Sequence, residues 1–226
     1  MADCPPPNEP LADPKSETRR RGRPVQMDQE TREAVVLNAA AELLASHGLA
    51  EASVAAIARK AGMSKRTIYQ MFDSREALLG ACLARIGQSL FRPLSEEHRT
   101  SPLEDRLRVL LTFSEDHCLT DAPLELLRAV ITEAPTYPQL ARGILDTGHC
   151  ALARFISAEL RAGVATGELD LPVDQCDEAA EMLMDMAFGS ILEKLLDPAS
   201  LPHCAETKAA RRDRAIALFL SGARPR

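Results

Sequence analysis

The chain has 226 residues, 46% of them hydrophobic and 27% charged, which is ordinary for a globular protein with its own core. No apolar run approaches the roughly 18 to 20 residues of a membrane span, and the acidic, proline-rich residues 1–14 are unlike a secretory signal. We therefore expect a cytoplasmic protein with no membrane partner. With 4% aromatic residues and no Trp, the composition favours helices and predicts an all-α fold.

The net charge of −6 is unevenly distributed along the chain. Residues 15–75 hold 11 lysines and arginines against 7 aspartates and glutamates, whereas residues 76–226 hold 16 against 23. The N-terminal part is therefore basic and the remainder acidic. This asymmetry suits contact with a polyanion at one end of the molecule only.

Spacing of apolar residues and the positions of Gly, Pro and Ser predict about nine helices and no strand. Residues 1–18 contain five prolines and are expected to be disordered, and residues 19–27 form a basic arm. Ser74 and Asp174 are predicted N-caps, and a bend is expected at Gly148. The helices are expected at about residues 28–47, 54–61, 64–72, 74–91, 101–117, 121–133, 138–166, 174–196 and 206–220.

The most informative segment is 54–71, VAAIARKAGMSKRTIYQM. Two helices that cross near a right angle need a small residue where they touch and a glycine in the turn, which Ala58 and Gly62 supply. Ser64 is then placed to cap the second helix, whose first turn offers cations to the major groove. The sequence thus predicts a helix-turn-helix, although an ordinary exposed hairpin with charges for solubility has the same local pattern.

Side-chain chemistry assigns roles at this predicted surface. Arg and Lys suit guanine, Gln suits adenine, and the Thr methyl suits thymine, while hydroxyls donate to phosphates. The candidate DNA-contacting residues are Ser53, Ser64, Lys65, Arg66, Thr67, Tyr69, Gln70 and Arg75. In the basic arm, Arg19, Arg20, Arg21 and Arg23 are placed to enter a narrow minor groove, the alternative being a flexible tail with non-specific affinity only.

Residues 31–83 closely resemble the DNA-binding domain of the TetR family of regulators. The resemblance lies in VLNAA and in HGLAEASVAAIARKAGMSKRTIYQMFDSREALL. It implies a helix-turn-helix domain over residues 28–75 and a ligand-binding and dimerisation domain over residues 76–222. Arg66 stands where many members have glycine, and Arg75 where lysine is common; both substitutions affect the operator sequence rather than DNA binding itself.

The rest of the chain carries a second resemblance. Residues 127–148, LRAVITEAPTYPQLARGILDTG, are similar to the C-terminal domain of a TetR subgroup that includes efflux-regulating repressors. This implies a homodimer and a small-molecule effector. Expected dimer contacts are Leu183, Ala187, Ile191, Leu195, Ile216 and Phe219, and expected pocket residues are Phe113, His117, Tyr137, Phe155, Met182, Met186 and Phe188. For both sets the alternative is an intramolecular core.

Three His-Cys pairs, at 117–118, 149–150 and 203–204, suggest a thiol- or metal-responsive alternative. Because the six cysteines lack CxxC spacing, we assign no metal and no cofactor. An enzyme is the remote alternative, since no HExxH, GxSxG, phosphate loop or dinucleotide loop occurs, so no residue is assigned as catalytic. The sequence predicts a homodimeric repressor that binds a palindromic operator on double-stranded DNA and is released by an apolar ligand. An activator on the same fold is the nearer alternative.

Overall fold

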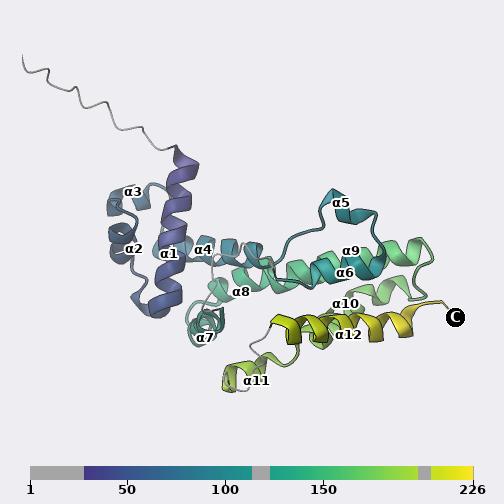
Figure 1. Cartoon of the computed structure of the whole chain (residues 1–226). Coiled ribbons are helices and arrows are strands. Elements are labelled where there is room, and N and C mark those ends of the chain that lie inside the picture. Colours follow the sequence, from purple (N-terminus) through teal and green to yellow (C-terminus); the bar gives the residue numbers. More distant parts are fainter. Residues whose placement is uncertain (1–27, 114–122, 198–204, 226) are drawn as a thin grey trace, which may run out of the picture.

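The computed structural model of the chain describes residues 28–113, 123–197 and 205–225. These residues are all-helical and contain no strand, which confirms the predicted fold class. The N-terminal helices, which we call the head, lie at one end of the molecule, and a bundle of α6 (Leu103–Leu110), α9 (His149–Ala165), α10 (Cys176–Phe188) and α12 (Ala205–Ala223) lies at the other (Figure 1). No described helix combines the length and apolar character needed to cross a membrane.

The head consists of four helices, each of which begins at a capping side chain. In each case an Asp or Ser side chain accepts a hydrogen bond from the backbone N–H three residues further on. Such caps stabilise a helix by about 1 kcal/mol, which explains why these starts are predictable from sequence. The helices are α1 (Gln29–Glu51, kinked at Gly48), α2 (Val54–Lys60), α3 (Lys65–Tyr69) and α4 (Arg75–Leu90), capped by Asp28, Ser53, Ser64 and Ser74 respectively.

The remaining helices are α5 (Glu96–Arg99), α6 (Leu103–Leu110), α7 (Pro123–Glu133), α8 (Pro138–Thr147), α9 (His149–Ala165), α10 (Cys176–Phe188), α11 (Ile191–Leu196) and α12 (Ala205–Ala223), with a 3-10 turn, η1, at Val173–Gln175. The predicted helix 138–166 is broken at Gly148 rather than bent. The predicted helix 174–196 ends at Gly189, whose φ of 71° favours glycine, and restarts after Ser190. Asp174 lies inside η1 and caps no helix, and α5 is a helix that the sequence pattern did not predict.

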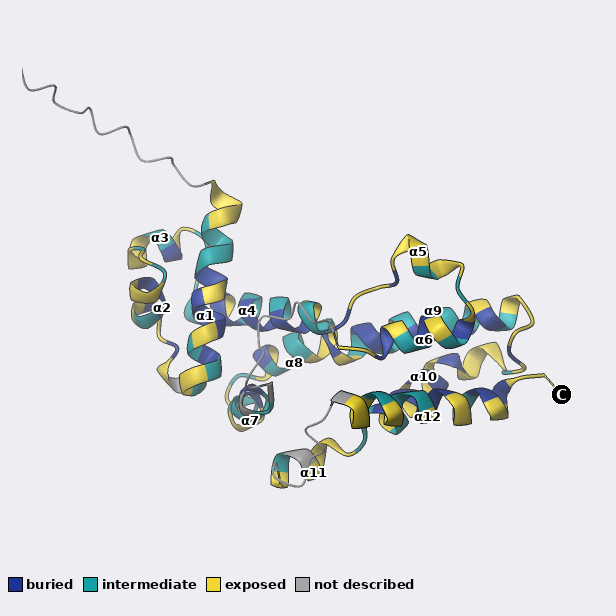
Figure 2. Ribbon diagram, viewed as in Figure 1, coloured by how far each residue is buried: buried dark blue, intermediate teal, exposed yellow. Residues whose placement is uncertain are grey.

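Two hydrophobic cores hold these helices together (Figure 2). The first core joins α1 to α4 with α7 and α8, which contribute Leu126, Val130 and Leu140. The second core is built from α6, α9, α10 and α12 and receives Phe91, the residue at the C-terminal end of α4. The predicted domain boundary at residue 75 follows the order of the chain, whereas the packing includes α4 in the head and places α7 and α8 against it.

One charged side chain is buried in the second half of the molecule. Arg106 on α6 is 8% exposed, and its guanidinium contacts Glu159 at 2.8 Å and Glu168 at 3.2 Å. A buried cation is tolerated because two carboxylates neutralise it. The pair of contacts ties α6 to the C-terminal half of α9 and to the turn that follows it.

Candidate DNA-binding interface and effector region

The turn between α2 and α3 has the geometry that the sequence predicts. Ala58 is buried, and its carbonyl accepts a hydrogen bond from Met63 N–H at 2.9 Å. Gly62 has φ of 66°, in the left-handed region that favours glycine. The small residue and the glycine therefore bring the two helices close and fix the direction in which α3 leaves the turn.

One face of α3 is anchored and the opposite face is free. Ile68 is buried in the first core, and the Ser64 hydroxyl accepts from Thr67 N–H at 3.0 Å and lies 2.8 Å from Thr67 Oγ1. The exposed residues of α3 and its flanks are Ser64, Lys65, Arg66, Tyr69 and Gln70. The structure thus brings the predicted base-reading and phosphate-contacting side chains together on one outward face (Figure 2).

Two predicted phosphate contacts also have structural roles. Ser53 is exposed and caps α2 by accepting from Ala56 N–H at 3.2 Å. Arg75 is half-buried, and its Nε donates to Ala52 O at 3.3 Å while its Nη2 donates to Leu49 O. Its side chain thus ties the start of α4 to the corner between α1 and α2, and its contact with phosphate stays a prediction. The arm residues Arg19, Arg20, Arg21 and Arg23 lie outside the described residues.

An aromatic cluster brings together two of the predicted pocket residues. Phe113 and Phe188 lie 5.3 Å apart between ring centroids, and Phe91 joins them at 5.1 Å and 5.8 Å. Phe91 is buried, whereas Phe113 is 48% exposed, so the cluster opens onto the surface. Sequence analysis missed Phe91 because the pattern marks it only as the end of a helix. The sequence pattern offers no signal that would bring Phe91 together with Phe113 and Phe188, because the three lie far apart along the chain.

The other described pocket candidates lie at several places in the fold, and a single pocket formed by all of them stays a prediction. Phe155 and Met186 pack against the second core, and Met182 is exposed on α10. Tyr137 lies in a different place, and His117 is outside the described residues. The reason is that helical spacing predicts which residues share a face but not which faces meet.

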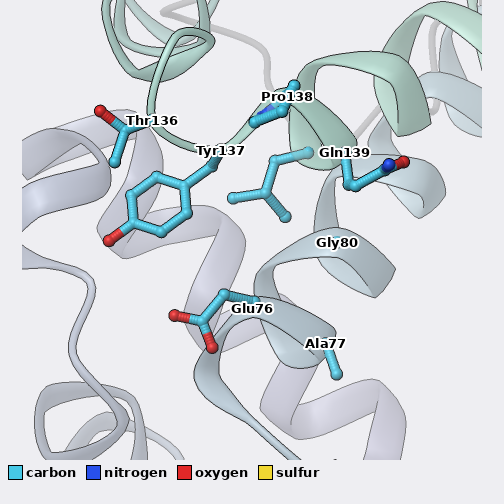
Figure 3. A pocket seen from close by; sticks show the side chains of 8 residues that line it. Glu76, Ala77, Gly80, Thr136, Tyr137, Pro138 and Gln139 are labelled. Atoms are coloured by element: carbon cyan, nitrogen blue, oxygen red, sulfur yellow. The ribbon is translucent and has the colours of Figure 1, made fainter.

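Tyr137 lines a surface pocket of about 400 Å³ between α4 and the start of α8 (Figure 3). The tyrosine hydroxyl and the Glu76 carboxylate point to the same side of this pocket, and Gln139 points away from them (Figure 3). The lining residues are Glu76, Ala77, Gly80, Thr136, Tyr137, Pro138, Gln139 and Leu140. The pocket lies between the N-terminal part of α4 and the N-terminal end of α8.

Three of the predicted dimer contacts belong to the protomer's own core. Leu183, Ala187 and Ile216 are at most 5% exposed, because α10 and α12 pack against each other with these residues between them. The prediction of a partner contact is corrected for these three. Ile191 is exposed, and Leu195 and Phe219 are half-buried, so they remain available.

The outer face of α10 and α12 carries apolar residues that the sequence analysis did not select as contacts. Met182 is 59% exposed and Leu218 is 62% exposed. A groove of about 440 Å³ runs beside Leu218 and is lined by Met186, Thr207, Ala210, Arg211, Arg214, Ala215 and Leu218. We call this surface, with Met182, the α10–α12 face.

In the part of the chain that is described, the cysteines give little support to a thiol- or metal-responsive site. Burial raises the pKa of the Cys176 thiol, which keeps it protonated and unreactive near neutral pH. Cys82 is also buried, and Cys150 is half-buried beside the exposed His149. Within the described ranges, no three His, Cys, Asp or Glu residues are placed to hold a metal ion. The pairs at 117–118 and 203–204 lie outside those ranges.

An anchored helix-turn-helix with an exposed polar face, joined to a helical body, defines a DNA-binding transcriptional regulator. Residues 36–82 match the family described as bacterial regulatory proteins of the tetR family. Residues 105–222, more than half of the chain, match the family described as the AefR-like transcriptional repressor C-terminal domain. The chain therefore belongs to the TetR family of transcriptional regulators and is not an enzyme.

Similar proteins agree with this assignment. The HTH-type transcriptional regulator UidR of Escherichia coli K12 is 24% identical over 161 residues, which cover 70% of this chain and 79% of UidR. The flavonoid-responsive regulator FrrA is 25% identical with a TM-score of 0.64, covering 86% of this chain and 98% of FrrA. A TetR regulator from Agrobacterium tumefaciens has the same identity and TM-score, covering 85% of this chain and 94% of its own.

Proposed function

We propose that the chain is a homodimeric repressor that binds a two-fold symmetric operator and is released by a small planar aromatic ligand. The observation that carries the proposal is the position of the aromatic cluster. Phe91 terminates α4, whose N-terminal end packs with α1 to α3 in the first core, so a ligand that displaces Phe91 acts directly on the helix that orients α3.

The reading surface is the exposed first turn and outer face of α3. Lys65 and Arg66 donate to guanine edges, Gln70 pairs with adenine, and the Thr67 methyl meets thymine. Tyr69 donates to a flanking phosphate and sets register rather than sequence. With roughly six to ten phosphate contacts per dimer, affinity falls by about 10³ to 10⁵ between 50 and 200 mM salt.

The ligand class follows from the cluster. Three phenylalanine rings within 6 Å of one another supply offset-stacking and edge contacts for another ring and present no charged group to it. The half-exposed ring of Phe113 gives a ligand access from solvent. FrrA, similar in fold and 25% identical, is named as flavonoid-responsive, which supports the same chemical class here.

The dimer forms through the α10–α12 face. Met182 and Leu218 are large apolar side chains that a second copy would cover. The exposed carboxylates of Glu181 and Asp185 on α10 complement the exposed guanidiniums of Arg211 and Arg214 on α12. A two-fold interface that sets α10 of one protomer against α12 of its partner would therefore pair opposite charges around an apolar centre.

DNA selection with the purified full-length protein tests the operator claim directly. We expect a palindrome whose half-sites lie about one helical turn, roughly 34 Å, apart. Flavone, as an uncharged planar probe, should then release the selected DNA in a fluorescence-anisotropy titration. An asymmetric consensus would contradict the dimer, and retention of DNA at saturating flavone and at every other aromatic probe would contradict aromatic release.

Paired variants locate the ligand. Phe113→Ala removes a ring of the cluster, and we expect the flavone concentration for half-release to rise about tenfold while DNA affinity without ligand is unchanged. Tyr137→Ala is the matched control, because it removes an aromatic ring from the separate pocket between α4 and α8. An effect of Tyr137→Ala alone would move the ligand to that pocket.

Sedimentation velocity tests the dimer face. Met182→Glu places a charge at the centre of the proposed interface and is expected to give monomers at concentrations where the wild type is dimeric. Leu145→Glu is the control, since Leu145 is 52% exposed on α8, away from α10 and α12. Equal sedimentation of both variants and the wild type would exclude this interface.

A further inference from the structure

Among the described residues, α4 and the junction of α8 with α9 both pass from one hydrophobic core to the other. Along α4, residues up to Ile86 belong to the first core, and Phe91 belongs to the second. Along the other crossing, Leu140 on α8 belongs to the first core and Leu152 on α9 to the second. The passage from one core to the other therefore falls near Gly87 in α4 and near Gly148, where α8 ends and α9 begins.

Gly87 and Gly148 are in backbone contact at this crossing. A Cβ added to Gly87 would overlap Thr147 Oγ1 and lie 3.0 Å from Gly148 N and 3.2 Å from Ile144 O. A Cβ added to Gly148 would lie 2.9 Å from Ile144 O and 3.6 Å from Gly87 Cα. The Thr147 hydroxyl is held in place because it donates to Gly143 O at 2.7 Å. Only glycine fits at position 87 without displacement of the neighbouring helix.

This close approach is local to one end of the interface between α4 and α8. Two turns earlier on α4, a Cβ at Gly80 would lie 3.4 Å from the end of the Leu140 side chain, which is an ordinary contact. Beyond Gly80 the helices separate enough to leave the pocket of Figure 3. The two helices therefore touch backbone to backbone at Gly87 and are held apart by side chains nearer the head.

Apart from the Thr147 hydroxyl, the atoms nearest to Gly87 at this crossing belong to backbone, so few interlocking side chains oppose a change in the angle of α4 there. From Gly87 back to Arg75, α4 spans roughly 18 Å at about 1.5 Å per residue. A tilt of about 10° at Gly87 would move the start of α4, and the head with it, by about 3 Å. That displacement is close to the rise of one base pair, roughly 3.4 Å.

We propose that Gly87 and Gly148 are positioning residues that set the distance between the two recognition helices and thereby the half-site spacing of the operator. This inference rests on the proposed dimer. Neither glycine touches DNA; both act through the angle at which α4 leaves the second core. Thr147 belongs to the same device, because its hydroxyl limits how far α4 can move toward α8.

A spacing series tests the proposal on the full-length protein. Half-sites from the selected operator are joined with spacers that differ by single base pairs, and affinities are measured for the wild type and for Gly87→Ala. We expect Gly87→Ala to keep the half-site sequence but to shift the preferred spacing by at least one base pair, with at least a tenfold loss at the wild-type spacing. Gly143→Ala on α8 is the matched control, since an added Cβ there meets nothing within 4 Å.

A second variant tests whether the overlap between a Cβ at position 87 and Thr147 Oγ1 causes the effect. Thr147→Ala removes the hydroxyl that an alanine at position 87 would strike, so the double variant Gly87→Ala/Thr147→Ala should return part of the way to wild-type spacing. A purely destabilising effect of Gly87→Ala would instead lower affinity equally at all spacings. Folding of every variant is checked by thermal melting before the DNA titrations.

A distance measurement tests the hinge without DNA or dimer geometry. Spin labels are attached to unnatural residues at two exposed positions, Gln70 in the head and Ala162 on α9. Labelled protein is diluted into excess unlabelled protein, so that the measured distance between the labels lies within one chain and reports the angle between the head and the second core. We expect Gly87→Ala to shift this distance and Gly143→Ala to leave it unchanged. A wild type without any spacing preference would contradict the proposed dimer alone, whereas an unchanged distance in folded Gly87→Ala would overturn the hinge.

Discussion

The surfaces of the two halves of the molecule differ in character. In the head, Tyr69 on α3 is the only large apolar side chain strongly exposed among described residues up to 91, and the rest of that face is polar or cationic. On the body the exposed large apolar residues are numerous: Val109, Phe113, Ile131, Leu145, Val173, Met182, Ile191, Leu192, Leu196 and Leu218. Two of them, Met182 and Leu218, lie on the α10–α12 face that the proposed dimer would cover. The exposed side chains of the head therefore suit a polar partner, and those of the body suit apolar partners.

The cores beneath these surfaces differ in the same way. The first core contains α2, α3 and α4, and a local side-chain cap fixes where each of these helices begins. The structure of the head therefore depends largely on interactions between residues that are close in sequence. The second core depends on contacts between distant segments, such as α6 with α12 and α9 with α10. The two units should therefore respond separately to damage, which the following variants test.

The largest effects are expected from truncations inside each core. Leu79→Ala in the first core and Leu160→Ala in the second each remove a side chain with no exposed area, and each should lower the free energy of unfolding by about 2–5 kcal/mol. Both tyrosines, Tyr69 and Tyr137, lie on the first-core side, so tyrosine fluorescence reports that unit while circular dichroism reports all helices.

Urea titrations followed by both signals separate the units. Leu79→Ala should shift the tyrosine transition to lower urea more than Leu160→Ala does. If the two signals gave coincident transitions with equal shifts in both variants, the two cores would unfold as one unit. That result would contradict the view that the two units respond separately to damage.

A smaller effect is expected at Arg75. Its guanidinium donates to two backbone carbonyls at the corner of α1 and α2, and hydrogen bonds from a charged group contribute about 1.5–3 kcal/mol. Arg75→Ala should therefore lower the stability of the head by about that amount, measured in the tyrosine transition. Arg66→Ala, at an exposed position, is the control and should leave it unchanged. If Arg75→Ala weakened only DNA binding, its role would be the originally predicted phosphate contact.

The smallest effect concerns the ion pairs between α6 and α12. A hydrogen bond from Arg212 and the charge of Arg108 lower the pKa of Asp213 below its usual 3.8. Because the folded-state pKa is the lower one, this stabilisation is complete above pH 3.8 and is lost as the pH falls through the folded-state value. Asp213→Asn should thus cost under about 1 kcal/mol at neutral pH, and this difference from the wild type should vanish in acid titrations once the pH is below the folded-state pKa. A difference that persists there would point to lost packing instead.

What the sequence predicted well and what it missed have separate physical causes. The turn at Gly62 and the caps at Ser64 and Ser74 follow from interactions within four residues, so the head and its outward side chains were predictable. The break at Gly189 and the burial of Ile216 depend on which distant helix covers each face, and spacing alone does not contain that information. The convergence of Phe91, Phe113 and Phe188 is of the same kind, since three separate helices must meet to form it.

The most direct test of the account is the affinity of Lys65→Ala/Arg66→Ala for the selected palindrome, measured beside its thermal stability. Each lost bidentate contact with guanine is worth about 1–3 kcal/mol, so we expect affinity to fall at least about 30-fold. Because both side chains are exposed, the melting temperature should stay at the wild-type value. Unchanged affinity in a fully folded double variant would contradict the claim that α3 reads the operator.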